Sequence, residues 1–147
     1  MDANDRYYVA YQWLAQPGTG AVKGRDGFNV LGRLTTLGGL ALPEVKGFET
    51  SYPFLVERQE FLTDGGGPGH YRGGTGAEVT VHVKHPAEYS FRGEGSANST
   101  SFGVLGGRAA GIGGCSIRLQ DGSAYVAAAF IDADDQSRWR GRLRIAF

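Results

Sequence analysis

Alternation of apolar and polar residues is the strongest pattern in this sequence. Ala77, Val79, Val81 and Val83 fall on one side of an extended chain, and polar residues lie between them. This period of two predicts a strand over 77–83 with one buried face. Comparable patterns predict further strands at 6–14, 29–36, 54–62, 88–91, 116–120, 123–131 and 138–145. No long stretch has the 3.6-residue period of a helix, so the pattern predicts a nearly all-β protein.

The same patterns predict how the strands connect and where they lie. The strand at 6–14 is largely apolar on both faces, so we expect it to be covered on both sides. Asp121-Gly122 between two apolar runs is typical of a tight hairpin turn. His85-Pro86-Ala87 is expected to turn the chain after 77–83. In 138–145 four arginines alternate with other residues, mostly apolar, which predicts a basic face. That face is interpreted either as solvated or as an edge that docks on an acidic partner.

Glycine accounts for 25 of the 147 residues, and much of it lies in three segments at 16–27, 64–76 and 103–114. Small residues recur at every third position in these segments, with His70 as an interruption in the second. This is the period of polyproline II, in which glycine along one edge lets neighbouring backbones approach closely. The sequence therefore predicts a single domain over 1–147. Its two sheets are expected to form a barrel- or sandwich-like arrangement that runs into glycine-rich, polyproline II-like extended segments.

The segment 64–76 has the highest density of these residues, since eight of its thirteen positions are glycine or proline. Both residue types are unfavourable inside helices and inside ordinary strands. The segment lacks the serine-rich composition of a flexible linker. We therefore expect an ordered, glycine-packed structural motif on which other segments of the chain pack. Its members are Asp64, Gly66, Gly67, Gly69, Arg72, Gly73, Gly74 and Gly76.

Composition narrows the class of protein further. The chain has 8 Phe, 7 Tyr and 2 Trp, which argues against disorder. Its formal net charge is zero, so neither nucleic acid nor an anionic membrane is an expected partner. No apolar run is long enough to span a membrane, and the acidic, polar N-terminus does not resemble a signal peptide. We therefore expect a cytoplasmic protein, in which the single cysteine, Cys115, is a buried thiol.

Few residues are candidates for chemistry. His70 and Arg72 lie inside the glycine motif, where Arg72 would either clamp an anionic ligand or bond to backbone carbonyls of extended segments. His82 and His85 fall on opposite faces of a strand, so they are poor partners for one metal ion. The carboxylates Glu57, Glu60 and Asp64 have no partner that the sequence identifies. The glycine runs lack the lysine and the following helix of a phosphate-binding loop.

The order of these motifs resembles the hydantoinase B/oxoprolinase family. The matching runs are Gly18-Thr19-Gly20-Ala21, Gly24-Arg25-Asp26-Gly27, Leu42-Pro43-Glu44, Tyr52-Pro53-Phe54-Leu55-Val56-Glu57-Arg58, Asp64-Gly65-Gly66-Gly67-Pro68-Gly69, Arg72-Gly73-Gly74-Thr75-Gly76 and Gly103 to Gly114. The chain departs from the family at Gly65, where serine is usual, and at Gln59, where tyrosine is usual. A histidine-containing segment of the family is replaced by Leu31 to Thr36. The similarity extends from Tyr8 to Arg118.

This resemblance implies a role in a multi-subunit, ATP-dependent enzyme. Family members hydrolyse oxoproline or hydantoins, or carboxylate ketones. The size of this chain is similar to a separate small subunit of the acetophenone carboxylase type, in which a ketone, bicarbonate and ATP give a β-keto acid such as benzoylacetate. The implied partners are hydantoinase A-like ATP-binding subunits and a larger hydantoinase B-like subunit. ATP and a divalent metal are expected in those partners, with no catalytic residue, cofactor or metal in this chain.

Three functions follow as hypotheses. The first is a small structural subunit of a ketone carboxylase complex. The second is a subunit of a hydantoinase/oxoprolinase complex that contributes His70 or Arg72 to a shared active site. The third is a free-standing β-sandwich binding module. Backbone groups of glycine-rich extended segments need partners, and such segments bury few side chains. This favours a subunit that depends on another chain.

Overall fold

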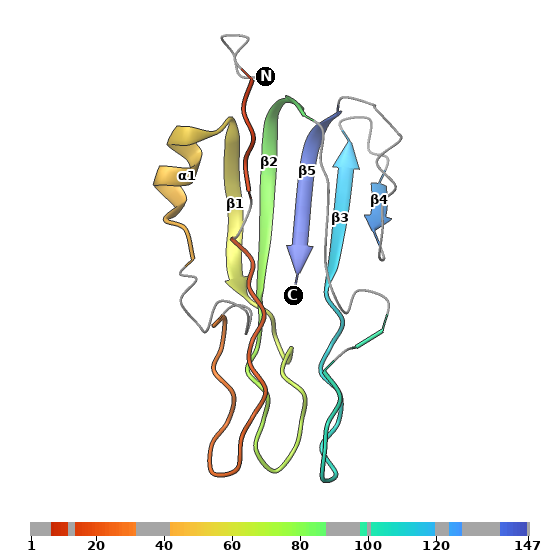
Figure 1. Ribbon diagram of the computed structural model, residues 1–147. Coiled ribbons are helices and arrows are strands. Elements are labelled where there is room, and N and C mark those ends of the chain that lie inside the picture. Colours follow the sequence, from red (N-terminus) through yellow and green to blue (C-terminus); the bar gives the residue numbers. More distant parts are fainter. Residues whose placement is uncertain are drawn as a thin grey trace.

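The computed structural model describes residues 7–11, 14–31, 42–87, 98, 99, 101–119, 124–127 and 139–146. In the order of the chain its elements are α1 (Val45–Ser51), β1 (Phe54–Phe61), β2 (Ala77–Ala87), β3 (Gly114–Leu119), β4 (Ala124–Ala127) and β5 (Trp139–Ala146). The five strands form one antiparallel sheet in the order β1-β2-β5-β3-β4 (Figure 1).

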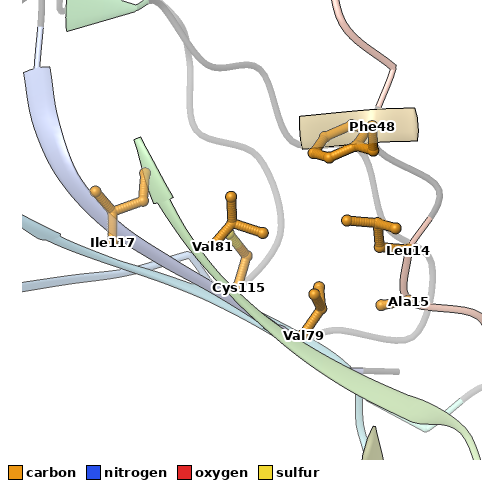
Figure 2. Packing of buried hydrophobic residues seen from close by; sticks show 7 residues of the cluster. All are labelled: Leu14, Ala15, Phe48, Val79, Val81, Cys115 and Ile117. Carbon is orange, nitrogen blue, oxygen red and sulfur yellow. The ribbon is translucent and has the colours of Figure 1, made fainter. Parts of the chain in front are cut away.

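This sheet confirms the prediction of a protein made mostly of strands. The predicted two-sheet barrel or sandwich is not confirmed, because the described strands form one sheet that stays open between β1 and β4. Among the described residues no second sheet covers its buried face. That face is instead packed against α1 and an extended N-terminal segment, whose Leu14, Ala15 and Phe48 contact Val79 and its neighbours (Figure 2).

The buried core explains why the alternating pattern is so clear in β2. This strand pairs with β1 on one side and with β5 on the other. Val79, Val81 and Val83 are each at most 2% exposed. From β3, Cys115 and Ile117 join the same cluster, as Figure 2 shows. The predicted buried thiol at Cys115 is confirmed.

A bulge in β1 decides which of its side chains reach the core. The register shifts between Val56 and Arg58, so that Glu57 is the extra residue. Val56 therefore pairs with Val81, and Gln59 pairs with Val79. The Gln59 Nε2 atom donates a hydrogen bond of 2.8 Å to the carbonyl oxygen of Leu14, which anchors the N-terminal segment over the sheet.

The helix α1 is absent from the sequence-based prediction because its seven residues are too few to display a helical period. Its N-terminus is capped by Glu44, whose carboxylate accepts hydrogen bonds from the backbone N–H groups of Lys46 and Gly47 at 3.1 and 2.6 Å. It ends at Tyr52, which precedes Pro53 and is extended, as is usual before proline. Phe48 is its buried residue.

The other predicted strands and turns agree with the structure in part. The predicted strands at 54–62, 77–83, 116–120 and 138–145 correspond to β1, β2, β3 and β5, and β3 pairs with β4 as a hairpin. The predicted turn at 85–87 is wrong, because β2 continues to Ala87 with an irregularity after Val83. The strand at 88–91, the turn at 121–122, and most of 29–36 and 123–131 lie outside the described residues.

Two expectations about strand position are wrong. The described part of 6–14 forms no ladder, and it is covered on one face only. Tyr7, Val9 and Tyr11 are 84%, 56% and 74% exposed, whereas Tyr8 on the other face packs against Tyr52 and Phe54. The last strand, β5, is not an edge, since it lies between β2 and β3. Alternation reports the two faces of a strand, and it carries no information on how many neighbours the strand has.

Candidate functional site

Three glycine-rich hairpins project from one end of the sheet and form the most unusual part of the molecule (Figure 1). We call them the first hairpin (16–30), the second hairpin (62–76) and the third hairpin (101–113), and together the hairpin bundle. The second hairpin joins β1 to β2 directly. Each contains one of the glycine-rich segments that the sequence identifies.

The second hairpin is the central member of the bundle. It accepts backbone hydrogen bonds from the first hairpin, from Gly27 N to the Arg72 oxygen at 2.8 Å and from Val30 N to the Thr75 oxygen at 3.0 Å. It donates one in return, from Gly74 N to the Thr19 oxygen at 2.9 Å. On the other side Arg108 of the third hairpin donates to the Pro68 oxygen at 2.9 Å. In an isolated extended segment these backbone groups would bond to water. In the bundle they form hydrogen bonds between hairpins instead.

Glycine is required in the bundle because backbones contact one another directly. A Cβ atom at Gly74 would overlap the carbonyl oxygen of Phe28 in the first hairpin. At Gly67 a Cβ atom would lie 2.7 Å from the carbonyl oxygen of Arg108 in the third hairpin. The second hairpin therefore contacts both neighbours through positions that no side chain can occupy. Gly67 belongs to the row of small residues at every third position, whereas Gly74 lies outside that row.

The other motif residues make contacts within the second hairpin. A Cβ atom at Gly66 would overlap the carbonyl oxygen of Gly73, and one at Gly69 would lie 3.1 Å from the Tyr71 oxygen. Gly73 donates to the Gly67 oxygen at 3.0 Å, and the oxygen of the buried Gly76 accepts from Leu62 N at 2.9 Å.

Side chains add fixed links between the first and second hairpins. Asp26 Oδ1 accepts a hydrogen bond from the backbone N–H of Arg72 at 2.7 Å. Asn29 Oδ1 accepts one from the backbone N–H of Thr75 at 2.9 Å. The Thr75 hydroxyl in turn donates to the Leu62 oxygen at 2.5 Å. These polar residues act as structural ties, which the sequence alone did not assign to them.

Arg72 has a partner that the sequence does not identify. Its Nη2 atom donates a hydrogen bond to Asp64 Oδ1 at 2.6 Å. The side chains are 50% and 80% exposed, so this ion pair is largely solvated. Asp64 has a φ of 55°, in the left-handed region, which aspartate tolerates better than most residues. The pair closes the base of the second hairpin.

His70 lies exposed at the tip of the same hairpin. Its ring meets the ring of Tyr71 edge-on, with the ring centres 4.7 Å apart. Neither Arg72 nor a carboxylate is recorded as a partner of His70 among the described residues. The structure therefore brings His70 and Arg72 onto one hairpin without building a general acid–base pair from them.

A second polar cluster lies on the face of the sheet that points away from the core. Arg58 bonds through Nη2 to the carboxylate of Glu78 and through Nε to Glu60 at 2.8 Å. Glu78 is only 3% exposed, whereas Arg58 and Glu60 are about half exposed. Glu57 is the extra residue of the bulge, and its Oε1 atom lies 3.9 Å from the Nδ1 atom of His82. The sequence contains all these residues, but the pairing depends on the register of β1 against β2.

This cluster lines a shallow hollow of about 440 Å³ formed by Glu57, Arg58, Glu78 and Thr80. Its arginine already has two carboxylate partners, so the hollow offers no free arginine to bind an anion.

The described residues contain no group of three histidine, cysteine, aspartate or glutamate side chains that could hold a metal ion. Within the same residues no helix is long and apolar enough to cross a membrane.

Comparison with known proteins agrees with the motif order. A family model described as hydantoinase B/oxoprolinase matches residues 1–140. The chain is also 36% identical, over 93 residues, to the caprolactamase subunit beta of Pseudomonas jessenii. That match covers 63% of this chain and 16% of the relative, so the chain spans a small part of the relative's length. On this evidence the chain belongs to the hydantoinase B/oxoprolinase family.

Proposed function

We propose that this chain is a structural, non-catalytic part of a multi-subunit, ATP-dependent enzyme that opens cyclic amides. The observation that carries the proposal is the family membership together with a relative that is named as a caprolactamase subunit. The partners are hydantoinase A-like ATP-binding subunits and a larger hydantoinase B-like subunit. ATP and any divalent metal are bound by those partners in a cytoplasmic complex.

Two features of the described residues support a non-catalytic role. Arg72 is paired with Asp64, and Arg58 is paired with Glu60 and Glu78, so both arginines already have carboxylate partners. His70 is exposed and contacts an aromatic ring rather than a base or a nucleophile. The glycine motif thus contributes shape and rigidity, and the reacting groups belong to partner subunits.

Exposed apolar residues support a subunit that is completed by another chain. Phe102, Val104 and Leu105 lie within four positions of the third hairpin; the first two are 77% and 70% exposed, and Leu105 is fully exposed. Apolar side chains exposed close together are typical of a surface that another protein covers.

The substrate class separates this proposal from ketone carboxylation. The name of the relative favours a lactam over a ketone, so the carboxylase hypothesis stands second. The test is to recover the tagged chain from its native host and to measure the mass of the complex and its ATP turnover with a lactam, with a hydantoin, and with a ketone plus bicarbonate. Lactam- or hydantoin-dependent turnover is expected. Turnover that requires a ketone and bicarbonate would replace the proposal with a carboxylase, and a folded monomer recovered alone would replace it with a binding module.

Arg72 provides the test of the non-catalytic role. In Arg72→Ala we expect unchanged ATP turnover per assembled complex, with Arg108→Ala as the matched control on the third hairpin. Loss of turnover in an intact complex, for Arg72→Ala alone, would show instead that the second hairpin reaches a shared active site.

A further inference from the structure

The third hairpin reverses direction in a tight turn that contains a leucine where other residues are usual. Gly107 N donates a hydrogen bond of 3.1 Å to the Val104 oxygen, which closes a four-residue turn around Leu105 and Gly106. Leu105 has a φ of 53° and Gly106 a φ of 88°, so both central residues lie in the left-handed region. Turns of this kind favour asparagine, aspartate or glycine at the first central position. Leucine is strained there because its Cβ atom crowds the backbone.

The same leucine is also unfavourable in its contact with water. Its side chain is fully exposed, and the nearby Phe102 and Val104 are 77% and 70% exposed. Ile112, in the returning part of the hairpin, is 58% exposed. Single exposed apolar residues are common on protein surfaces, but four in one hairpin are a concentration. Backbone strain and apolar exposure thus coincide at Leu105, and burial against another molecule would offset both.

Backbone contacts hold this turn in one conformation. A Cβ atom at Gly103 would overlap the backbone of Gly107, so the two arms of the third hairpin touch directly. Arg108 N donates to the Pro68 oxygen at 2.9 Å, so the second hairpin supports the turn from the side. A strained residue persists where the surrounding structure fixes its conformation. Leu105 is therefore presented in a fixed position at the end of the molecule from which the hairpins project (Figure 1).

We infer that Leu105 is an anchor residue that inserts into an apolar pocket of a partner protein chain, with Phe102 and Val104 in contact around it. A few apolar anchors that fill pockets supply most of the binding free energy of an interface. An anchor that is already held in its bound conformation loses little entropy on binding. The inference rests on the proposed function, which supplies the partner chain, and it adds which surface of this chain makes the contact.

A pocket of a different protein chain fits this tip better than a second copy or a membrane does. The tip projects from the molecule, so it requires a concave receptor. The hollow on the sheet of this chain would be a poor receptor, because it is lined by polar residues, namely Glu57, Arg58, Glu78 and Thr80. Binding to an anionic membrane surface draws on several basic residues, whereas Arg108 is the one charged residue in the sequence of 101–113.

Leu105→Asn separates binding from folding, because its two expected effects have opposite signs. Asparagine tolerates a positive φ and is polar, so the thermal unfolding midpoint of the full chain should rise by about 2 to 4 °C. The same change removes the anchor and should weaken the complex. Leu42→Asn, at a leucine outside the hairpins that is 39% exposed, is the matched control. A lower midpoint in Leu105→Asn would show that Leu105 serves the fold of this chain and would overturn the inference.

The first readout on the complex is its mass during dilution, after recovery from the native host on the tagged chain. The wild-type and Leu42→Asn complexes should dissociate at the same concentration, and the Leu105→Asn complex at a concentration about tenfold higher. Equal dissociation of all three would overturn the inference and leave the proposed function standing. A complex that depends on Leu105 but turns over only a ketone would contradict the proposed function alone. A tagged chain recovered by itself would contradict both.

The second readout identifies what covers the tip. Phe102→benzoylphenylalanine places a light-activated cross-linking group near Leu105, and mass spectrometry of linked peptides from the recovered complex identifies the residues that it contacts. Links to apolar residues of a different protein chain are expected. Links to a second copy of this chain or to lipid, or no link to a recovered partner, would overturn the inference.

Discussion

The sheet and the hairpin bundle are stabilised in opposite ways, although one chain builds both. Where the N-terminal segment packs on the sheet, side chains such as Leu14 and Val79 are fully buried, and removal of apolar surface from water is the main stabilising term. In the bundle, the closest contacts are between backbones at positions without side chains, as at Gly74. The sheet tolerates exchange among apolar residues of similar size, whereas the bundle tolerates no added atom at its contacts.

The largest effect is expected from adding one methyl group to the bundle. Gly74→Ala should lower the free energy of unfolding by at least about 4 kcal/mol, because the new Cβ atom meets backbone that cannot move aside. Urea unfolding monitored by circular dichroism measures this change.

Gly20→Ala is the matched control for Gly74→Ala. No atom lies within 4 Å of a Cβ built at Gly20, and its φ is not in the left-handed region. Its free energy of unfolding should stay within about 0.5 kcal/mol of wild type. Equal losses in the two variants would contradict the account of the bundle.

Removing side-chain volume from the core should have the next largest effect. Leu14→Ala should cost about 3 kcal/mol, because Leu14 is completely buried between the N-terminal segment and the sheet. Leu105→Ala, at a fully exposed position, should have almost no effect on the midpoint of thermal unfolding. A large loss in Leu105→Ala would mean that the third hairpin has a side-chain core of its own.

A smaller effect is expected at the polar cluster of the sheet. Glu78→Gln should cost about 1 kcal/mol, because Glu78 is buried but its partner Arg58 is half exposed and can turn to water. Glu60→Gln should cost less than about 0.5 kcal/mol, since Glu60 is itself half exposed. Comparing the two urea midpoints tests this order, and a reversed order would contradict the assigned pairing.

The smallest effect is expected at the base of the second hairpin. Asp64→Asn removes the charge of the pair with Arg72 but keeps a side chain that tolerates a positive φ. We expect a change of less than about 0.5 kcal/mol, and Asp64→Ala should be worse because alanine is strained at this φ. If thermal unfolding shows the two variants to be equal, the backbone argument at Asp64 is wrong.

The contrast also explains what the sequence could predict. Alternation in 77–83 and glycine density in 64–76 are local patterns. The first predicted β2, and the second marked a segment whose glycines contact neighbouring backbones. The pairing of Arg58 with Glu78 depends on a bulge at Glu57, and the central place of β5 depends on strand order. Neither is encoded locally. The helix α1 was missed because two turns are too short to show a period.

For function too, local sequence patterns predicted one part and left another part without a signal. The order of glycine motifs predicted the family. Each of the three glycine-rich segments contains a position where backbones meet directly, as at Gly18, Gly67 and Gly103. The substrate class had no local signal among these residues, since the polar side chains of the motif are paired with one another or with the backbone. Only the similarity to a caprolactamase subunit favours cyclic amides over ketones.

The most direct test of the central claim is amide hydrogen exchange at the hydrogen bonds between hairpins. The account predicts that the N–H groups of Gly27, Gly74 and Arg108, which are paired between hairpins, exchange at least about a hundredfold more slowly than free peptide. They should approach the protection of Val79 and Val81 in β2. Exchange of all three at the rate of free peptide, with β2 still protected, would show that the bundle does not form through these backbone contacts.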